Sequence, residues 1–501
     1  MHIRNWTRAL SAALLSTALL AGCGSTVVNP VTGREERTVM DEATEIAEGR
    51  KAHQQVLAEY GAYANPALQA YVDGIGQKLA RLSHRSALPW TFTVLDSHEI
   101  NAFALPGGFI YITRGLMAYL DSEAELAGVI GHEIGHVTAR HGAQRATRQQ
   151  DAGLGVLAAT VLGAVLESQG VGGATGMASQ MSQGVAAGWL ATYSREQELQ
   201  ADQLGAEYLA RNRYNPSNMV DVIGVLEKQE RFAADLARAE GRAAPAGANW
   251  LSSHPSNAQR LAEIRKIAAG YQGDYSDDGR TRYLKAINGM RFGESSAQGV
   301  TRGRNFYHEE LGIALTAPQG WRIQNAKEAV ALVNGAGDAG LVVRLVPPQA
   351  GKTHEEIIRN LVKPTGGSVT QRRIHGLAAT EFTGTRRTDQ GQTQAVRVLL
   401  VSGPGQRNYL IHRAARDAAA LQRATSGLAE AEASFRPLSG AESAAARPWV
   451  LKTVPFPRGG FAELARSSPL PAPAEAQLRL LNSAYAGGVE PRPGQPVKVV
   501  R

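Results

Sequence analysis

Cysteine is nearly absent from this sequence: its 501 residues contain only one, Cys23. A single thiol cannot form an internal disulfide, so a disulfide-stapled fold is excluded and a hydrophobic core must hold the chain together. The formal net charge is +8, but no long run of Lys or Arg and no nucleic-acid-binding pattern occurs. We therefore expect no nucleic-acid partner. The diffuse positive charge fits either ordinary solvation or contact with anionic envelope polymers and lipid head groups.

Long hydrophobic runs are also missing. The apolar segments at residues 9–20 and 154–166 are too short to cross a bilayer as helices. The first follows Arg4 and Arg8 and ends in Leu20-Ala21-Gly22-Cys23, which resembles a bacterial lipoprotein signal. That resemblance implies a signal peptide at residues 1–22, lipidation of Cys23 and, because Gly24 replaces Asp, an outer-membrane address in a Gram-negative cell. A secretory signal with a stray cysteine is the alternative.

The most informative stretch present is His132-Glu133-x-x-His136. Histidines four residues apart share one face of a helix, so both imidazoles can bind one zinc ion. Glu133 lies at the edge of that face, where a carboxylate can take a proton from metal-bound water. Chance would produce the pattern roughly 0.01 times in a chain of this length. Ser122 is the expected N-cap of this helix. The alternative is a buried helix whose histidines only pack.

A second helix is expected to supply the remaining metal ligand. Glu198 and Asp202 are four residues apart and share a face, so Glu198 can bind the metal while Asp202 accepts a hydrogen bond from a ligand histidine. Glu196 is the rival ligand, but its side chain faces elsewhere. Taken without the histidine motif, these carboxylates would indicate a solvated charged helix.

Periodicity predicts the elements around these motifs. Helices are expected from Asp41 to about Tyr60 and from Pro66 to Leu79, and strands at residues 90–95 and 109–112. Residues 154–166 predict a buried or surface-bound helical hairpin, with a membrane-dipping segment as the alternative.

Four motifs together resemble the bacterial zinc metallopeptidases of the HtpX, BepA and CAAX prenyl-protease group, which are gluzincins. The motifs are residues 101–108, residues 132–136 followed by Ala139-Arg140-His141, Ser194-Arg195 followed by Glu198 and Ala201-Asp202, and His254-Pro255-Ser256 followed by Arg260. They occur in the family's order and place a zinc metallopeptidase domain at residues 41–270.

This resemblance implies roles for individual residues. His132, His136 and Glu198 would bind one Zn²⁺ ion per chain, and Glu133 would be the base. Asn101 would contact the substrate backbone, and a substrate strand would pair along the edge near residues 109–112. The last motif, with His254 and Arg260, would close over the site. His254 would either steady the oxyanion or cap the metal as a resting inhibitor; local packing at a helix start is the alternative.

The remaining segments predict further units. Residues 23–40 are polar and predict a tether, and residues 271–304 contain Gly, Asp and Ser and predict a linker. Residues 305–437 resemble the small α+β PsbP/Mog-like domains and predict a binding or spacer domain. The strand-helix-helix-strand order of residues 448–501 resembles a LysM-like module. Its usual Gly-Asp-Thr turn is replaced by Arg458-Gly459-Gly460, so peptidoglycan binding and mere fold similarity both stay open.

The expected fold is therefore multidomain α+β: a mainly helical gluzincin domain with a small edge-strand sheet, a small α+β domain and a βααβ module. The expected function is zinc-dependent hydrolysis of misfolded or misassembled cell-envelope proteins in the periplasm, by a protein held on the membrane through its lipid. Two alternatives stay open: a protein that holds clients in the same groove, and a cell-wall factor recruited by residues 448–501.

Overall fold

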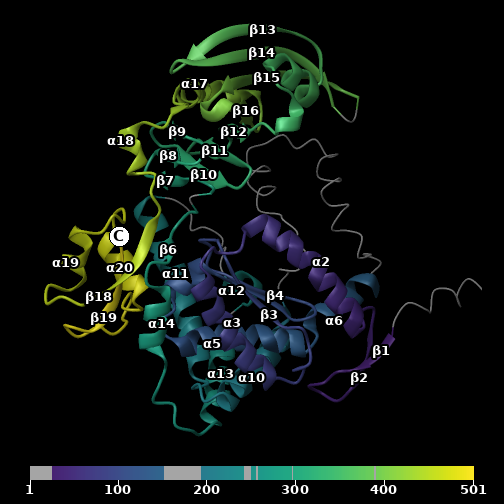
Figure 1. Ribbon diagram of the computed structural model, residues 1–501, viewed down its shortest axis with the longest axis vertical. Coiled ribbons are helices and arrows are strands. Elements are labelled where there is room, and N and C mark those ends of the chain that lie inside the picture. Colours follow the sequence, from purple (N-terminus) through teal and green to yellow (C-terminus); the bar gives the residue numbers. More distant parts are fainter. Residues whose placement is uncertain (1–24, 152–192, 242–249, 256–257, 296, 389–390) are drawn as a thin grey trace, which may run out of the picture.

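The computed structural model describes residues 25–151, 193–241, 250–255, 258–295, 297–388 and 391–501 (Figure 1). These residues form a mixed α+β structure with a helical part, a large antiparallel sheet and a C-terminal βααβ part. The predicted signal peptide, Cys23 and the predicted hairpin at residues 154–166 lie outside the described ranges. Within those ranges, no helix is both long and apolar enough to serve as a membrane span.

The segment predicted as a tether is a folded hairpin from residue 25 onward. Strands β1 (Ser25–Val28) and β2 (Glu35–Thr38) pair antiparallel. The hairpin is attached to the end of the metal-site helix: Asn29 Nδ2 donates to Ala139 O at 3.4 Å, and Arg140 Nη2 donates to Met40 O at 2.6 Å. The prediction was wrong because the polar residues hide a strand-turn-strand pattern with Gly33 in the turn at φ +67°.

The first helices form as predicted, and the strands form a small sheet. Helices α2 (Glu42–Tyr60) and α3 (Pro66–Arg81) begin at the N-caps Asp41 and Asn65. Strands β3 (Thr91–Leu95), β4 (Ala102–Leu105) and β5 (Phe109–Thr113) have the order β3-β5-β4. β5 is therefore central, and the prediction of a substrate edge at residues 109–112 was wrong.

Among the residues that the structure describes, the edge without a further strand belongs to β4 instead, since β3 is bridged on its outer side by Ala62. The turn at Pro106-Gly107-Gly108 folds β4 back onto β5, and both glycines have positive φ angles of +80° and +97°. A hairpin this short is hard to see from the sequence because the β4 residues alone, Ala-Phe-Ala-Leu, carry only a weak strand signal.

The metal-site helix α5 (Glu123–Thr138) is buried along its whole length, and Ser122 is its N-cap. It packs against α10 (Arg195–Arg211) through small residues. A Cβ added at Gly135 would lie 2.8 Å from Ala201 O, and one at Gly131 would lie 3.4 Å from Gly205 O. Because glycines permit this close approach, the histidines of α5 and the carboxylates of α10 share one space.

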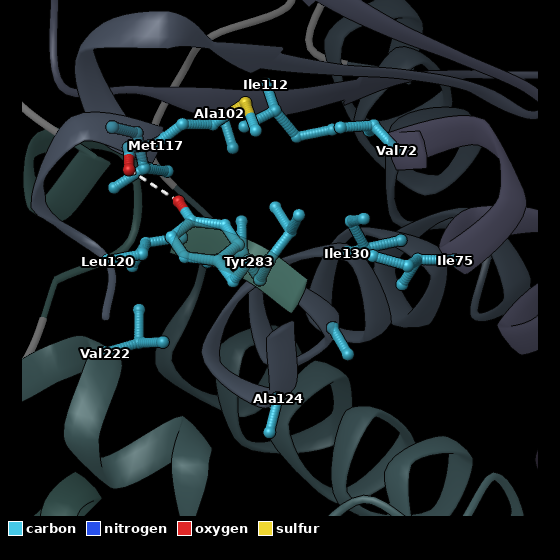
Figure 2. Packing of buried hydrophobic residues seen from close by; sticks show 14 of the residues in the cluster. Val72, Ile75, Ala102, Ile112, Met117, Leu120, Ala124, Ile130, Val222 and Tyr283 are labelled. Carbon is cyan, nitrogen blue, oxygen red and sulfur yellow. Dashed lines mark hydrogen bonds between the residues drawn. The ribbon is translucent and has the colours of Figure 1, made fainter. Parts of the chain in front are cut away.

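Further helices surround this pair: α4 (Arg114–Tyr119), α6 (His141–Asp151), α11 (Asn218–Ala239), α12 (Trp250–Ser253) and α13 (Ala258–Ala269). Residues 271–304, predicted as a linker, instead contain α14 (Arg280–Ile287) and strand β6 (Arg291–Phe292). Figure 2 shows Tyr283 of α14 inside the core, where its hydroxyl donates to Met117 O at 2.5 Å. Tyr283, Leu284 and Ile287 are buried at helical spacing, a signal masked by the surrounding Asp, Gly and Ser.

The middle of the chain forms two sheets. β7 (Val300–Arg302), β8 (Asn305–His308), β9 (Ile313–Thr316) and β17 (Arg436–Pro437) make a four-stranded sheet. The other is a seven-stranded antiparallel sheet; its order is β10 (Arg322–Ala326), β11 (Ala329–Val333), β12 (Ala339–Leu345), β16 (Asn408–Ala415), β15 (Thr393–Ser402), β14 (Leu377–Arg387) and β13 (Pro364–Ile374).

Helices pack on both faces of the seven-stranded sheet. One face packs against α17 (Thr425–Ala433), which follows the short helix α16 (Ala418–Arg423). Leu428 of α17 and the following Phe435 belong to the hydrophobic core on this face. On the opposite face, α15 (His354–Ile357) and the π-helical turn η2 (Ile358–Val362) pack against part of β14 and β15.

The C-terminal residues have the predicted βααβ order: β18 (Trp449–Pro455), α19 (Gly460–Arg466), α20 (Ala474–Leu481) and β19 (Pro496–Val500). They do not stand apart from the helical part. β18 pairs with β6 as well as with β19, and Phe461, Leu478 and Val499 belong to the same core cluster as the residues of α5. The resemblance to LysM stays a prediction, but any such module shares the core that contains α5.

Candidate metal centre

Four potential metal ligands meet where three segments converge. His132 and His136 come from α5, Glu198 from α10, and His254 follows α12. One ligand atom from each lies within 4.8 Å of the others, and all four side chains are buried. The two histidine Nε2 atoms are 3.0 Å apart, and Glu198 Oε1 lies 3.4 Å from His136 Nε2 and 2.9 Å from His254 Nδ1. Glu196, the rival ligand, is exposed and lies outside the group.

The Nδ1 atoms of His132 and His136 each lie close to a polar side chain. These partners show whether the Nε2 atoms are free of protons and can therefore bind a metal ion. His132 Nδ1 lies 2.9 Å from Asp202 Oδ1, as the spacing on α10 predicts. His136 Nδ1 lies 2.8 Å from His141 Nδ1, and His141 Nε2 lies 2.9 Å from Gln200 Oε1. Since Gln200 Oε1 can only accept, His141 carries its proton on Nε2 and accepts from His136 at Nδ1. Both helix histidines thus present an unprotonated Nε2 to the centre, as metal binding requires.

Burial supports this neutral state of the outer histidine. Burial is the main reason that the pKa of His141 is lowered to about 4. A neutral imidazole can act at once as acceptor and donor in the chain from His136 to Gln200, whereas a charged imidazole would donate at both nitrogens.

Glu133 is held by one oxygen and free at the other. Trp250 Nε1 donates to Glu133 Oε1 at 2.9 Å, and His254 Nε2 lies 3.5 Å from the same oxygen. Oε2 is buried and has no hydrogen-bond partner among the residues that the structure describes. A buried carboxylate oxygen without a partner beside the ligand cluster is positioned as a general base should be.

Arg260 is buried against the two carboxylates of α10. It is 1% exposed; Nε and Nη2 contact the two oxygens of Asp202 at 2.7 and 2.8 Å, and Nη1 lies 2.7 Å from Glu198 Oε2. Nη1 also donates to His254 O at 3.1 Å. Burial opposes the charge on Asp202, but the hydrogen bonds from Arg260 and His132 outweigh it and lower its pKa. Arg260 therefore ties the His254 segment to α10.

Asn101 lies at the start of the free strand edge. It directly precedes β4, and its Oδ1 atom is buried without a hydrogen-bond partner among the described residues. The neighbouring Ile100 O accepts from Trp250 N at 2.9 Å, so the edge begins beside the segment that carries His254.

Sequence reasoning missed four residues of the centre. The motifs contain His141 without indicating its contact, and no pattern in the sequence indicates a role for Gln200, Tyr193 or Trp250. Tyr193 stacks on His136 with ring centroids 3.8 Å apart. The five-residue step from His136 to His141 could have suggested a contact, since these residues flank the end of α5. Nothing in the sequence predicts that Trp250 reaches Glu133 from 117 positions away.

Two histidines on one helix, a glutamate from a second helix and a carboxylate with a free oxygen define a zinc metallopeptidase site. Comparisons with known proteins agree. Residues 66–268 match the model of peptidase family M48. The chain is 28% identical over 228 residues to the beta-barrel assembly-enhancing protease of Yersinia pestis, covering 45% of this chain and 44% of that protein. It is 31% identical over 181 residues to the mitochondrial metalloendopeptidase OMA1 of Arabidopsis thaliana, covering 36% and 32%.

The residues that match the family M48 model include those of the metal centre, and each match spans less than half of this chain and less than half of either relative. A solved structure of cyanobacterial PsbP from Synechocystis covers 28% of this chain and 98% of its own, at 11% identity and a TM-score of 0.19. A score this low assigns no fold, so the PsbP/Mog-like resemblance stays a prediction.

Proposed function

We propose that the protein is a zinc-dependent endopeptidase that hydrolyses misfolded or misassembled cell-envelope proteins. The observation that carries this proposal is the pairing of two unprotonated Nε2 atoms with the free Oε2 of Glu133 in one buried centre. The similarity to the beta-barrel assembly-enhancing protease of Yersinia pestis supports a substrate among envelope proteins.

The β4 edge accounts for recognition of unfolded chains. Thr113 N donates to Asn101 O at 3.0 Å, so this residue pair lies in a hydrogen-bonded position. Alternation along an antiparallel pair then turns the backbone groups of Ala102 and Ala104 to the free edge. A substrate strand can pair with these groups whatever its side chains, which suits a protease for unfolded proteins. Asn101 at the start of the edge would contact the substrate backbone.

The residues of the centre divide the chemistry among them. His132, His136 and Glu198 would hold a zinc ion, which when bound would supply a Lewis acid for activation of water and polarisation of the scissile carbonyl. Glu133 takes the proton at its free Oε2 and passes it to the leaving amine, while Trp250 holds Oε1 in place. Asp202 and Arg260 keep His132 oriented.

His254 is proposed to cap the metal in a resting state. Its Nδ1 lies 3.2 Å from His132 Nε2 and 2.9 Å from Glu198 Oε1, which places it in the ligand group. Departure of His254 would open the position that water and substrate need. This geometry also keeps open the client-holding alternative, in which the capped site binds without cleaving.

Replacement of the base tests the enzyme assignment. Glu133→Gln should abolish cleavage of an unfolded outer-membrane protein while the zinc content, measured by elemental analysis, stays at one ion per chain. The matched control is Glu196→Gln, an exposed carboxylate of α10, which should cleave like the original protein. Cleavage by Glu133→Gln at the original rate would refute the enzyme assignment and favour client holding.

The location is proposed as the periplasmic face of the outer membrane, with the lipid on Cys23 as the anchor. The lipoprotein-like signal supports this. Cys23→Ser should move the protein from the membrane to the soluble fraction, and persistent sedimentation with membranes would contradict the lipid anchor. Peptidoglycan is a further proposed partner through residues 448–501.

A further inference from the structure

One edge of the seven-stranded sheet is left open by the rest of the described chain. Strand β13 ends the strand order, and Figure 1 shows it as the outermost strand, at the top. Among the residues that the structure describes, only β14 pairs with it. Residues 365–371 are all exposed, with Val369 at 48%, and none of them is charged. A row of unpaired backbone groups on such an edge is a template for another strand.

Side chains of the same chain cover two other sheet edges. Asn482 occupies the edge of β19: its Oδ1 accepts from Lys498 N at 2.7 Å, and its Nδ2 donates to Lys498 O at 2.8 Å. Gln69 does the same for β3, where it accepts from Val94 N at 3.1 Å and donates to Phe92 O at 2.9 Å. Within the described ranges β13 has no such side chain, and it contains no lysine, a residue that commonly protects an edge.

The turn after β13 shows which of its backbone groups face outward. His375 and Gly376 form a two-residue loop with φ angles of +46° and +82°, as in a type I′ turn. In such a hairpin the flanking residues Ile374 and Leu377 form a hydrogen-bonded pair, and every second residue back along β13 also bonds to β14. The backbone groups that face the open edge therefore belong to Gly367, Val369, Gln371 and Arg373.

The regular part of β13 is symmetric about its own midpoint. A bulge at Thr365 interrupts the pairing with β14 at one end, and the turn ends it after Ile374 at the other. Residues 366–374 remain between them, and Thr370 is their centre. Two copies related by a two-fold axis at Thr370 would pair antiparallel over residues 367–373, with about eight backbone hydrogen bonds and the two Thr370 side chains opposite each other.

The charges of the strand permit this self-pairing. In the symmetric register Arg373 lies opposite Gly367 and Arg372 opposite Ser368, so no two like charges face each other across the axis. Arg372 is also neutralised within its own copy, because its guanidinium contacts the buried Glu432. The edge thus combines open backbone groups, a two-fold register and no opposed like charges.

We propose that β13 pairs with the same strand of a second copy and joins the two seven-stranded sheets into one continuous sheet. Few side chains accompany the backbone pairing, so the dimer is weak and reversible. The strand belongs to residues 305–437, so the pairing uses no residue of the metal centre and does not depend on proteolysis.

The test uses the full chain with Cys23→Ser and Glu133→Gln, which removes the only thiol and the candidate base. Sedimentation equilibrium over a range of concentrations should show a reversible monomer–dimer equilibrium. Thr370→Lys places two ammonium groups opposite each other and should weaken association at least about tenfold, with partial recovery at high salt. Thr425→Lys, at an exposed threonine of α17, is the matched control and should associate like the parent chain.

Cysteine cross-linking then tests the register. Opposite residues of a non-hydrogen-bonded antiparallel pair have Cα atoms about 4.5 Å apart, which a disulfide can bridge. In the chain without Cys23, a single Thr370→Cys substitution should therefore give a disulfide-linked dimer when copper–phenanthroline and air oxidise the two thiols. Gln371→Cys, at the neighbouring position that lies opposite Val369, should cross-link about tenfold more slowly.

Val369→Pro gives an independent measurement. Proline at this position removes one outward N–H and leaves the bonds to β14 in place, so association should weaken while far-UV circular dichroism stays unchanged. A chain that stays monomeric at every concentration would overturn the proposal, and so would association that Thr370→Lys leaves unchanged or cross-linking through Gln371→Cys as fast as through Thr370→Cys. A monomer that instead captures an unfolded outer-membrane protein on β13 would identify a client site and also overturn it.

Discussion

Lys498 offers the sharpest test of how the C-terminal residues support the metal-site helix. This lysine of β19 is 1% exposed, and its Nζ donates to Ala118 O at 3.0 Å and Leu120 O at 2.6 Å. Nζ also lies 2.9 Å from Asp121 Oδ1. All three acceptors directly precede Ser122, the N-cap of α5. The C-terminal strand therefore fixes the start of the helix that carries His132 and His136.

The magnitude of the effect follows from what Lys498→Met leaves behind. Methionine preserves the apolar stem but removes the charge that reaches the two carbonyls. Breaking a buried ion pair by removal of one partner costs about 3–5 kcal/mol. Arg280 Nη1 remains 3.4 Å from Asp121 Oδ1 and compensates in part, so we expect a loss near the lower end, about 3 kcal/mol in the free energy of unfolding.

Urea denaturation, followed by far-UV circular dichroism and tryptophan fluorescence, measures this loss. The control is Lys452→Met on the paired strand β18, where the lysine is exposed and the expected change is within about 0.5 kcal/mol. A cycle with Asp121→Asn should show a coupling free energy of about 1–3 kcal/mol. A loss below about 1 kcal/mol, or one equal to that of the control, would refute the reasoning. Since residues 448–501 share the core, peptidoglycan binding is best tested by surface substitutions and not by deletion.

The remaining predictions concern the metal centre and its helix. Gln200→Leu removes the acceptor that sets the tautomer of His141, so zinc affinity in a chelator competition should fall about 10–100-fold. Gln200→Glu keeps the acceptor and should bind zinc nearly normally. Equal affinities of the two variants would contradict the proposed hydrogen bonds from His136 through His141 to Gln200. Burial raises the pKa of Glu125 from 4.5 to about 8, so the folded state holds a proton that the unfolded state releases. The free energy of unfolding should therefore fall as the pH rises from 4.5 to about 8, by at most about 1.4 kcal/mol per pH unit. Glu125→Gln should flatten this slope in urea titrations, and an unchanged slope would assign it to other groups. His254→Ala should change the rate of cleavage and leave zinc in place; loss of the metal would show that His254 is a required ligand.

The pattern that predicted the centre is local. His132, Glu133 and His136 lie on one helix, and Glu198 and Asp202 on another, so spacing alone dictates which side chains face together. The same holds for α3 and for the βααβ order at the C-terminus, where each element carries its own periodicity. Strand pairing is not local in this sense, which explains why the wrong strand was predicted as the edge: β4 carries only four small and apolar residues.

The sequence by itself determined the candidate metal ligands, the candidate base and the approximate positions of most helices, because each motif and each helix depends on residues within one or two helical turns of each other. Only the tertiary structure decided which atoms surround them. Trp250 on Glu133, Gln200 on His141 and Lys498 before α5 each join segments far apart in the chain. Such contacts depend on how closely two helices approach, as α5 and α10 do at Gly135 and Ala201. They also depend on which buried polar atoms still lack a hydrogen-bond partner once the helices have packed. Periodicity does not record either property, since both arise only when the elements pack.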